Sequence, residues 1–277
     1  MDFLHPASLA AALDFKAARP DALPVAGGTD VMVGINFGRL HPPALLDVSQ
    51  LTELTTVDRT GPLLRLGAGV SFTRLMAELG DVLPGLAMAS RTVGSPQIRN
   101  RGTVGGNLGT ASPAGDCHPV LLATGATIEV ASVRGRRLIP AAEFFTGPKR
   151  NALEPDELIT AILLPPAPGP QLFAKVGTRN AMVIAVCSLA LELDGDAVRV
   201  AIGSAGPVPL RATEAEEFFS GTTELTEAVS RRFGELVAAA ARPIDDVRGT
   251  ADYRRHALGV LARRTLHWAW ESRCAYV

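Results

Sequence analysis

The chain has 277 residues, of which 47% are hydrophobic, and its 27 basic and 28 acidic side chains leave a formal net charge of -1. This length suits one large domain or two smaller ones, and the balanced charge offers no attraction to nucleic acid or to an anionic membrane surface. The longest apolar run, Ala181 to Leu191, has about half of the ~20 residues that a membrane-spanning helix requires. We therefore expect no membrane span and interpret the run as a buried strand.

The N-terminus and the cysteines bear on compartment and on metals. Asp2 stands where a secretory signal carries positive charge, and Pro6 interrupts the segment early, so we expect a cytoplasmic protein. Cys117, Cys187 and Cys274 are odd in number and far apart, which fits neither a disulfide framework nor clustered metal ligands. No metal site is expected on this chain, and redox chemistry would need an organic cofactor.

The first part of the chain is expected to mix α and β structure. A helix is predicted over 8–19, because a serine cap precedes it and a proline follows it. A strand then enters a glycine turn at 26–30, and a helix follows that turn. Further strands are predicted over 63–72 and 126–132.

The organisation changes near Pro165, where four prolines fall within the nine residues 163–171. Such a segment is typical of a linker or a crossing loop, and we divide the chain into residues 1–168 and 169–277. The second part is predicted to contain a hairpin turn at 194–196 and helices over 222–241 and 250–272. In the last helix, the following residues have helical spacing and are expected to face the core: Tyr253, Ala257, Val260, Leu261, Thr265 and Trp268.

Two glycine pairs are candidate ligand loops. "AGGTD" (26–30) and "TVGGN" (103–107) each flank Gly-Gly with hydroxyl or amide side chains. The dinucleotide fingerprint Gly-x-Gly-x-x-Gly is not fulfilled, since its nearest candidate, "GAGVSF" (67–72), has Phe72 at the position of the third glycine. The sequence has no P-loop motif either. Glycine lets backbone N–H groups approach an anion, and the helix expected after the first loop adds its positive dipole end. The residues alone leave both a phosphate site and structural turns open.

Both motifs together resemble a known family. "VAGGTDVMVGI" (25–35) followed by "GTVGGNLGTASPAGDCHPVLLATGA" (102–126) is similar to the FAD-binding, or medium, subunit of molybdenum hydroxylases, the group that contains xanthine dehydrogenase and carbon monoxide dehydrogenase. The likeness continues through 156–165 and 173–185 and so spans nearly the whole chain. It implies an α+β fold: a two-part α/β FAD-binding domain of the vanillyl-alcohol-oxidase, or PCMH, type, followed by a C-terminal α+β domain that covers the flavin side.

The resemblance also implies which residues bind FAD. Loops 26–31 and 103–107 would surround the diphosphate, and Thr110 and Asp116 would face the flavin end. Asp116 would accept hydrogen bonds from ribityl hydroxyls. The expected cofactor-binding residues are Val25, Ala26, Gly27, Gly28, Thr29, Asp30, Val31, Thr103, Gly105, Gly106, Asn107, Thr110, Asp116, Ile159 and Lys175.

Plainer roles remain open for several of these residues. Gly106 is expected to approach the diphosphate too closely to admit a Cβ, and a positive φ would add to its need for glycine. Asp116 would also serve as the N-cap of the following helix, and Lys175 as a solvated strand lysine. The Arg-Asn-Arg sequence at 99–101 suits a solvated turn or a subunit contact.

Two features argue against further roles. Cys117 and His118 are adjacent, but no cluster of ligands at suitable spacing joins them, so no metal is expected there. Val183 stands where the family has an aspartate, in "AMVIA" (181–185). Whatever that aspartate does near the flavin edge is not carried over to this chain.

The function implied by the resemblance is an electron relay. In the family, a large subunit oxidises substrate at a molybdenum-pterin centre, a small subunit passes electrons through two [2Fe-2S] clusters, and the flavin delivers them onward. We therefore expect noncovalent FAD here, with molybdenum-pterin and iron-sulfur clusters only on partner subunits, in a dimer of heterotrimers. No residue of this chain is expected to act as a nucleophile or general acid, because the flavin carries the chemistry.

Two alternatives are kept. One is a self-contained FAD-dependent reductase of the UDP-N-acetylmuramate dehydrogenase type, and the other is a non-catalytic nucleotide-binding or assembly protein. The substrate of the assembled enzyme and its terminal electron acceptor are left open, because both depend on other chains.

Overall fold

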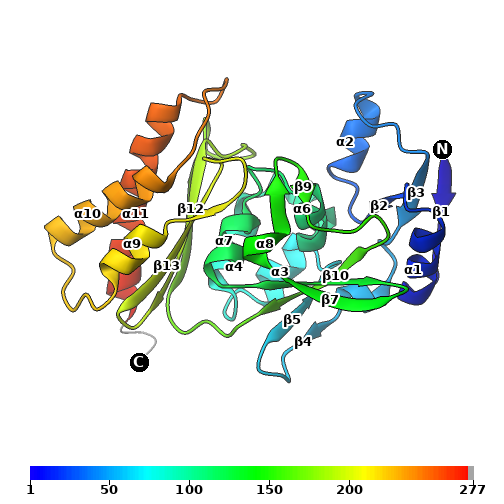
Figure 1. Cartoon of the computed structure of the whole chain (residues 1–277), viewed down its shortest axis with the longest axis horizontal. Helices are drawn as coiled ribbons and strands as arrows, with labels where there is room; N and C mark the ends of the chain where they lie inside the picture. The colour runs from blue at the N-terminus through cyan, green and yellow to red at the C-terminus, as the bar shows by residue number, and fades with distance from the viewer. Residues whose placement is uncertain (274–277) are drawn as a thin grey trace.

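A computed structural model describes residues 1–273, so Cys274 lies outside the described residues. Three of the four sheets follow one another along the long axis of the molecule (Figure 1), and the fourth is the short two-stranded sheet of β8 and β9. The N-terminal sheet lies at one end, a five-stranded sheet in the middle, and a four-stranded sheet with its helices at the other end. Among the described helices, none is long and apolar enough to cross a membrane.

The N-terminal unit is a small parallel sheet with the strand order β1-β3-β2. Helix α1 begins after Ser8, whose hydroxyl accepts a hydrogen bond from the amide of Ala11, so the predicted helix is confirmed. Parallel strands need crossover connections, and α1 provides the first of them. The elements are β1 (Asp2–Leu4), α1 (Leu9–Ala18), β2 (Leu23–Val25), α2 (Val31–Asn36), β3 (Ala44–Asp47) and the 3-10 turn η1 (Thr52–Thr55).

The middle unit is an antiparallel sheet in the order β4-β5-β10-β6-β7. The strand predicted over 63–72 ends at Gly67, because Ser71 caps a helix by accepting from the amide of Arg74. The elements are β4 (Val57–Asp58), β5 (Leu64–Gly67), α3 (Phe72–Glu78), α4 (Pro84–Thr92), α5 (Pro96–Arg101), α6 (Val104–Thr110), α7 (Cys117–Ala123), β6 (Thr127–Ser132), β7 (Gly135–Pro140), α8 (Ala141–Phe144), β8 (Phe145–Gly147), β9 (Arg150–Asn151) and β10 (Leu158–Leu164).

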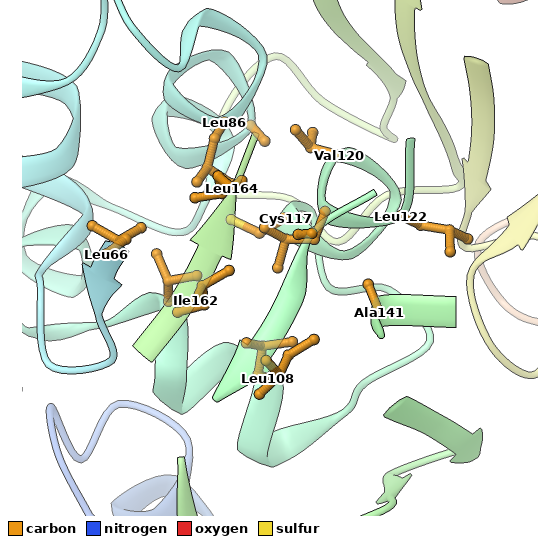
Figure 2. Packing of buried hydrophobic residues seen from close by; sticks show 14 of the residues in the cluster. Leu66, Leu86, Leu108, Cys117, Val120, Leu122, Ala141, Ile162 and Leu164 are labelled. Atoms are coloured by element: carbon orange, nitrogen blue, oxygen red, sulfur yellow. The ribbon is translucent and has the colours of Figure 1, made fainter. Parts of the chain in front are cut away.

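The core of the middle unit holds the two segments that carry the candidate site. Leu108 of α6 and Cys117 of α7 are fully buried against Ile162 of β10 and Leu66 of β5 (Figure 2). Both short helices are therefore fixed by apolar packing. Helix α7 is buried along its whole length, whereas α6 leaves Gly106 and Gly109 exposed.

The C-terminal unit is a four-stranded antiparallel sheet in the order β11-β12-β13-β14, covered by α9, α10 and α11 (Figure 1). The predicted hairpin is confirmed, since Asp194 pairs with Ala197 and Gly195 has a φ of 58°. The elements are β11 (Gln171–Val176), β12 (Cys187–Asp194), β13 (Ala197–Gly203), β14 (Leu210–Arg211), α9 (Thr213–Phe219), α10 (Glu227–Ala240) and α11 (Ala251–Ser272).

Two predictions for this unit are wrong in part. The run Ala181 to Leu191 is not one buried strand: Met182 and Ile184 are 55% and 52% exposed in a loop, and β12 begins only at Cys187. Half of the predicted core stripe of α11 also faces outward, namely Tyr253, Val260 and Trp268.

The reason for the second error is close helix packing. A Cβ on Gly234 of α10 would lie 2.7 Å from the carbonyl oxygen of Gly259 of α11. Helices that approach so closely need small residues at their contact. The apolar residues that α11 buries are Ala257, Leu258, Ala262, Leu266 and Ala269, whereas Tyr253, Val260 and Trp268 lie on its exposed side.

Candidate functional site

The first glycine pair is held directly against the segment that precedes the second. A Cβ on Gly27 would lie 1.9 Å from the carbonyl oxygen of Arg101 and 2.9 Å from the amide nitrogen of Gly102. Gly28 has a φ of 72°, which non-glycine residues rarely adopt. Both glycines are thus required by the backbone, and the two loops lie side by side.

The first loop leaves a row of backbone donors without partners. The amides of Gly27, Gly28 and Thr29 make no hydrogen bond to any residue in the range 1–273. Successive free N–H groups in a turn form a concavity suited to an anion. This loop has the donors that the sequence predicts for a phosphate site.

The second loop differs from the prediction. Thr103 is the N-cap of α6, and the amides that follow it are already used: Gly105 donates to the carbonyl of Ala68 at 3.0 Å, and Gly106 donates to Thr103 Oγ1 at 2.9 Å. Asn107 donates to the carbonyl of Thr103 at 3.0 Å. The glycine pair therefore supplies helix geometry rather than a second row of free amides.

The positive φ suggested for Gly106 is wrong, because this residue lies in the first turn of α6. A Cβ there would meet only Thr103 Oγ1, at 3.1 Å. Gly106 and Gly109 are both exposed on α6, and residues three apart lie on the same face of a helix. That face offers bare backbone, which permits a ligand to approach closely.

A cavity of about 120 Å³ lies between the two loops. Two hydroxyls in its wall accept from backbone amides, Ser71 from Arg74 and Thr103 from Gly106, so each keeps its own hydrogen free to donate. The volume suits a phosphate-sized group rather than a whole dinucleotide. The lining residues are Ala26, Gly27, Val48, Ser49, Gly69, Ser71, Asn100, Arg101 and Thr103.

Four of these lining residues have no role in the sequence prediction: Val48, Ser49, Gly69 and Ser71. Val48 and Ser49 lie in a segment without a recognisable motif, and Gly69 and Ser71 lie in "GAGVSF", which does not fulfil the dinucleotide fingerprint. Only the meeting of the loops brings these residues together. Outside the cavity, the hydroxyl of Thr110 donates a hydrogen bond of 3.4 Å to the carboxylate of Asp30. That bond links the start of α2 to the end of α6.

A buried ion pair forms the second part of the site. Lys175 Nζ of β11 lies 2.6 Å from Asp116 Oδ2, and it also donates to the carbonyls of Thr92 and Val183 at 3.1 Å each. The side chains of Lys175 and Asp116 are 9% and 7% exposed. The solvated role considered for Lys175 is therefore wrong, and its ammonium joins β11 to α4 and α7.

Asp116 does not cap α7, since its side chain makes no hydrogen bond to the helix amides. Its Oδ2 accepts from Lys175 and from Thr92 Oγ1, whereas its Oδ1 is buried without a partner among the described residues. Burial raises the pKa of this carboxyl, and Lys175 opposes that shift. The free Oδ1 can accept one further hydrogen bond.

Ile159 and Val25 occupy strand ends around the same region. Ile159 lies at an irregularity of β10, and its Cδ1 would be 4.0 Å from a Cβ on Gly109. Val25 ends β2 and is buried directly before the first glycine loop. Both residues fix neighbouring backbone by packing.

Cys117 and His118 are buried beneath α6. Burial raises the pKa of the Cys117 thiol, which keeps it protonated and inert. His118 Nε2 lies 3.1 Å from the carbonyl oxygen of Asn107, so Nε2 carries the proton and donates it, whereas Nδ1 has no partner within residues 1–273. The ring supports the last turns of α6 and is not placed to contact a ligand.

His118 predicts a pH dependence of stability. Burial lowers its pKa from 6.5 to about 4, so between these values the unfolded chain binds more protons than the folded chain. The free energy of unfolding should therefore fall as the pH drops from 6.5 towards 4, by up to about 3 kcal/mol from this group.

Urea denaturation at pH 7 and pH 4.5 measures this effect. His118→Gln is the matched control, because an amide can still donate to Asn107 but does not titrate. The variant should show a smaller loss of stability over the same interval. An equal loss in both proteins would contradict the assignment to His118.

The residues present fit an extended, diphosphate-bearing cofactor. Free amides and free hydroxyls meet at one end of α6, and the helix is bare at Gly106 and Gly109. Asp116, in the segment that follows the other end of α6 in the chain, has an unpartnered acceptor. Negative charge at the first end and hydroxyl or imide donors at the second would satisfy these groups.

Comparisons with known proteins agree with this geometry. Residues 1–167 match the family model of the FAD binding domain in molybdopterin dehydrogenase, and residues 173–269 match that of the CO dehydrogenase flavoprotein C-terminal domain. The chain is 33% identical over 271 residues to the nicotine 6-hydroxylase medium subunit of Paenarthrobacter nicotinovorans, with 95% of each chain covered. It is 31% identical over 275 residues to the xanthine dehydrogenase FAD-binding subunit of Escherichia coli O157:H7, covering 94% of this chain and 92% of that subunit.

Solved structures share the whole fold. A chain of the Cu,Mo-CO dehydrogenase, in its cyanide-inactivated form, superposes with a TM-score of 0.91 at 28% identity, covering 100% of this chain and 98% of the other. A chain of quinoline 2-oxidoreductase from Pseudomonas putida 86 gives a TM-score of 0.92 at 26% identity, covering 97% and 96%. The chain therefore belongs to the family of FAD-binding oxidoreductase subunits of molybdenum hydroxylases.

Proposed function

We propose that this chain is the electron-transfer subunit of a molybdenum hydroxylase, which receives electrons from [2Fe-2S] clusters of a partner subunit and passes them through FAD to a terminal acceptor. Bound flavin supplies the chemistry, because it exchanges single electrons with clusters and releases electrons in pairs. The residues of this chain bind the flavin and hold it in position. The observation that carries the proposal is the meeting of free amides, free hydroxyls and bare helix backbone along α6.

For the diphosphate, we propose the donors of loop 26–31 on one side and Thr103 on the other. The free amides of Gly27, Gly28 and Thr29 and the hydroxyl of Thr103 support this placement. Gly105, Gly106 and Asn107 would then act through the shape of α6. The ligand would run along the exposed face of that helix towards Thr110.

For the flavin end, we propose Asp116, with Ile159 and Lys175 beside it. The unpartnered Oδ1 of Asp116 can accept from a ribityl hydroxyl. Lys175 has three acceptors already, at 2.6 to 3.1 Å, so it would hold Asp116 and the loop at Val183 in place. Val183 contributes its carbonyl oxygen, and no side-chain acid stands there.

We further propose that FAD is bound noncovalently and that the chain is divided into two parts, residues 1–168 and residues 169–277. The first part would clasp FAD between its two sheets, and the second would cover the flavin side. The buried ion pair between Asp116 and Lys175 would fasten the two parts together. We also propose a cytoplasmic enzyme.

The partners proposed are a large molybdopterin-binding subunit and a small [2Fe-2S] subunit, in a dimer of heterotrimers. Exposed apolar side chains support contacts with other chains: Met32, Val33 and Phe37 of α2 and its end are 41%, 48% and 71% exposed. The mean hydropathy of +0.20 agrees with surfaces that are covered in a complex.

Purification of the native complex tests this function. The chain is expected to co-elute with a large molybdenum-containing chain and a small iron-sulfur chain, and acid precipitation should release one FAD per copy into the supernatant. Flavin retained in the pellet, iron bound to the isolated chain, or elution solely as a 29.0 kDa monomer would contradict it. Oxidation of NADPH with a sugar nucleotide by the chain alone would establish the self-contained reductase instead.

A further inference from the structure

We infer that Arg101 supplies the positive charge that pairs with the cofactor's diphosphate. The inference rests on the proposed FAD site and adds a residue to it. Arg101 lines the cavity between the two loops, and the eight other lining residues are neutral: Ala26, Gly27, Val48, Ser49, Gly69, Ser71, Asn100 and Thr103. A diphosphate bound there would meet donors from the backbone and hydroxyls but only one cation.

The backbone of Arg101 is firmly placed at the rim of this cavity. It is the last residue of α5, and its carbonyl oxygen lies against Gly27, where a Cβ would be only 1.9 Å away. The following residue, Gly102, donates to the carbonyl of Ile98 at 2.6 Å. The root of the arginine side chain therefore stays next to the free amides of the first loop.

The guanidinium of Arg101 is available to bind a ligand. It makes no hydrogen bond or ion pair with any residue that the structure describes. Arg99, two residues earlier, behaves differently, since its Nη1 donates to the carbonyls of Val93 and Gly94 at 3.1 and 2.9 Å. The Arg-Asn-Arg sequence is thus divided into one arginine that fixes a turn and one that remains available.

Charge and geometry favour a diphosphate as the partner. A guanidinium is always protonated, and its planar donors match two oxygens of a phosphate. A basic side chain in the last turn of a helix also stabilises the helix through its dipole, but that effect alone would not change the affinity for a ligand. The two roles predict different results for ligand binding.

Equilibrium binding of FAD to the deflavinated full-length chain tests the inference. Arg101→Gln should weaken FAD binding about 10-fold to 100-fold, the range expected for one charge-assisted hydrogen bond. The dependence of affinity on NaCl concentration should also become shallower, because one ionic contact is lost. Arg101→Lys should restore part of the affinity and the salt dependence, since it keeps the charge without the planar donors.

Arg231→Gln is the matched control, because Arg231 is exposed on α10. It should leave affinity and salt dependence unchanged. If Arg101→Gln binds FAD with wild-type affinity and salt dependence, the inference is overturned while the proposed function stands. A lower melting temperature with an unchanged salt dependence would likewise overturn it, by assigning Arg101 to α5 alone. If the wild-type chain binds no FAD, the proposed function fails as well.

Discussion

Gly27→Ala is expected to give a folded chain that no longer retains FAD. The new Cβ would lie 1.9 Å from the carbonyl oxygen of Arg101, and neither backbone can yield without separating the two loops. Overpacking of this kind costs about 1–3 kcal/mol, which is less than the typical stability of a domain. Flavin content per chain after gel filtration should therefore fall far more than the melting temperature.

Gly61→Ala is the control for this experiment. The nearest atom to its Cβ would be the carbonyl oxygen of Leu63, at 3.8 Å, so the substitution has room. This variant should keep full flavin occupancy. If Gly27→Ala also retains wild-type occupancy, the loops do not form the binding site as proposed.

Lys175→Met should give the largest loss of stability among the substitutions considered. It would leave the Asp116 carboxylate buried without its cation, and breaking a buried pair in this way typically costs about 3–5 kcal/mol. The free energy of unfolding in urea measures this loss. The carbonyls of Thr92 and Val183 would lose their donor as well.

Adding Asp116→Asn to Lys175→Met should recover much of the lost stability, because the amide removes the uncompensated charge. The double-mutant cycle then gives the interaction free energy of the pair. Strictly additive effects of the two substitutions would contradict a direct ion pair.

Much of the fold is predictable from local signals. Ser8 and Thr250 cap the helices that begin after them, and the turn at 194–196 joins two strands, because caps and turns depend on neighbouring residues only. The apolar run Ala181 to Leu191 shows the limit of such signals. Hydropathy does not reveal that Met182 and Ile184 lie in an exposed loop.

The candidate site is predictable in its residues more than in their roles. The first glycine loop has the free amides that its sequence suggests, whereas the pair Gly105 and Gly106 lies in a helix whose amides are already bonded. A local pattern does not show which acceptors lie opposite a loop. The position of Arg101 beside Gly27 and the three acceptors of Lys175 arise from contacts between distant segments.

The most direct measurement is a crystal structure of the full-length chain with FAD bound. The diphosphate is expected to lie against the amides of Gly27, Gly28 and Thr29, opposite the hydroxyl of Thr103, with the flavin end towards Asp116. Density for the cofactor away from these loops would contradict the placement of the site. A chain that crystallises without flavin after saturation with FAD would contradict its proposed function as the FAD-carrying subunit.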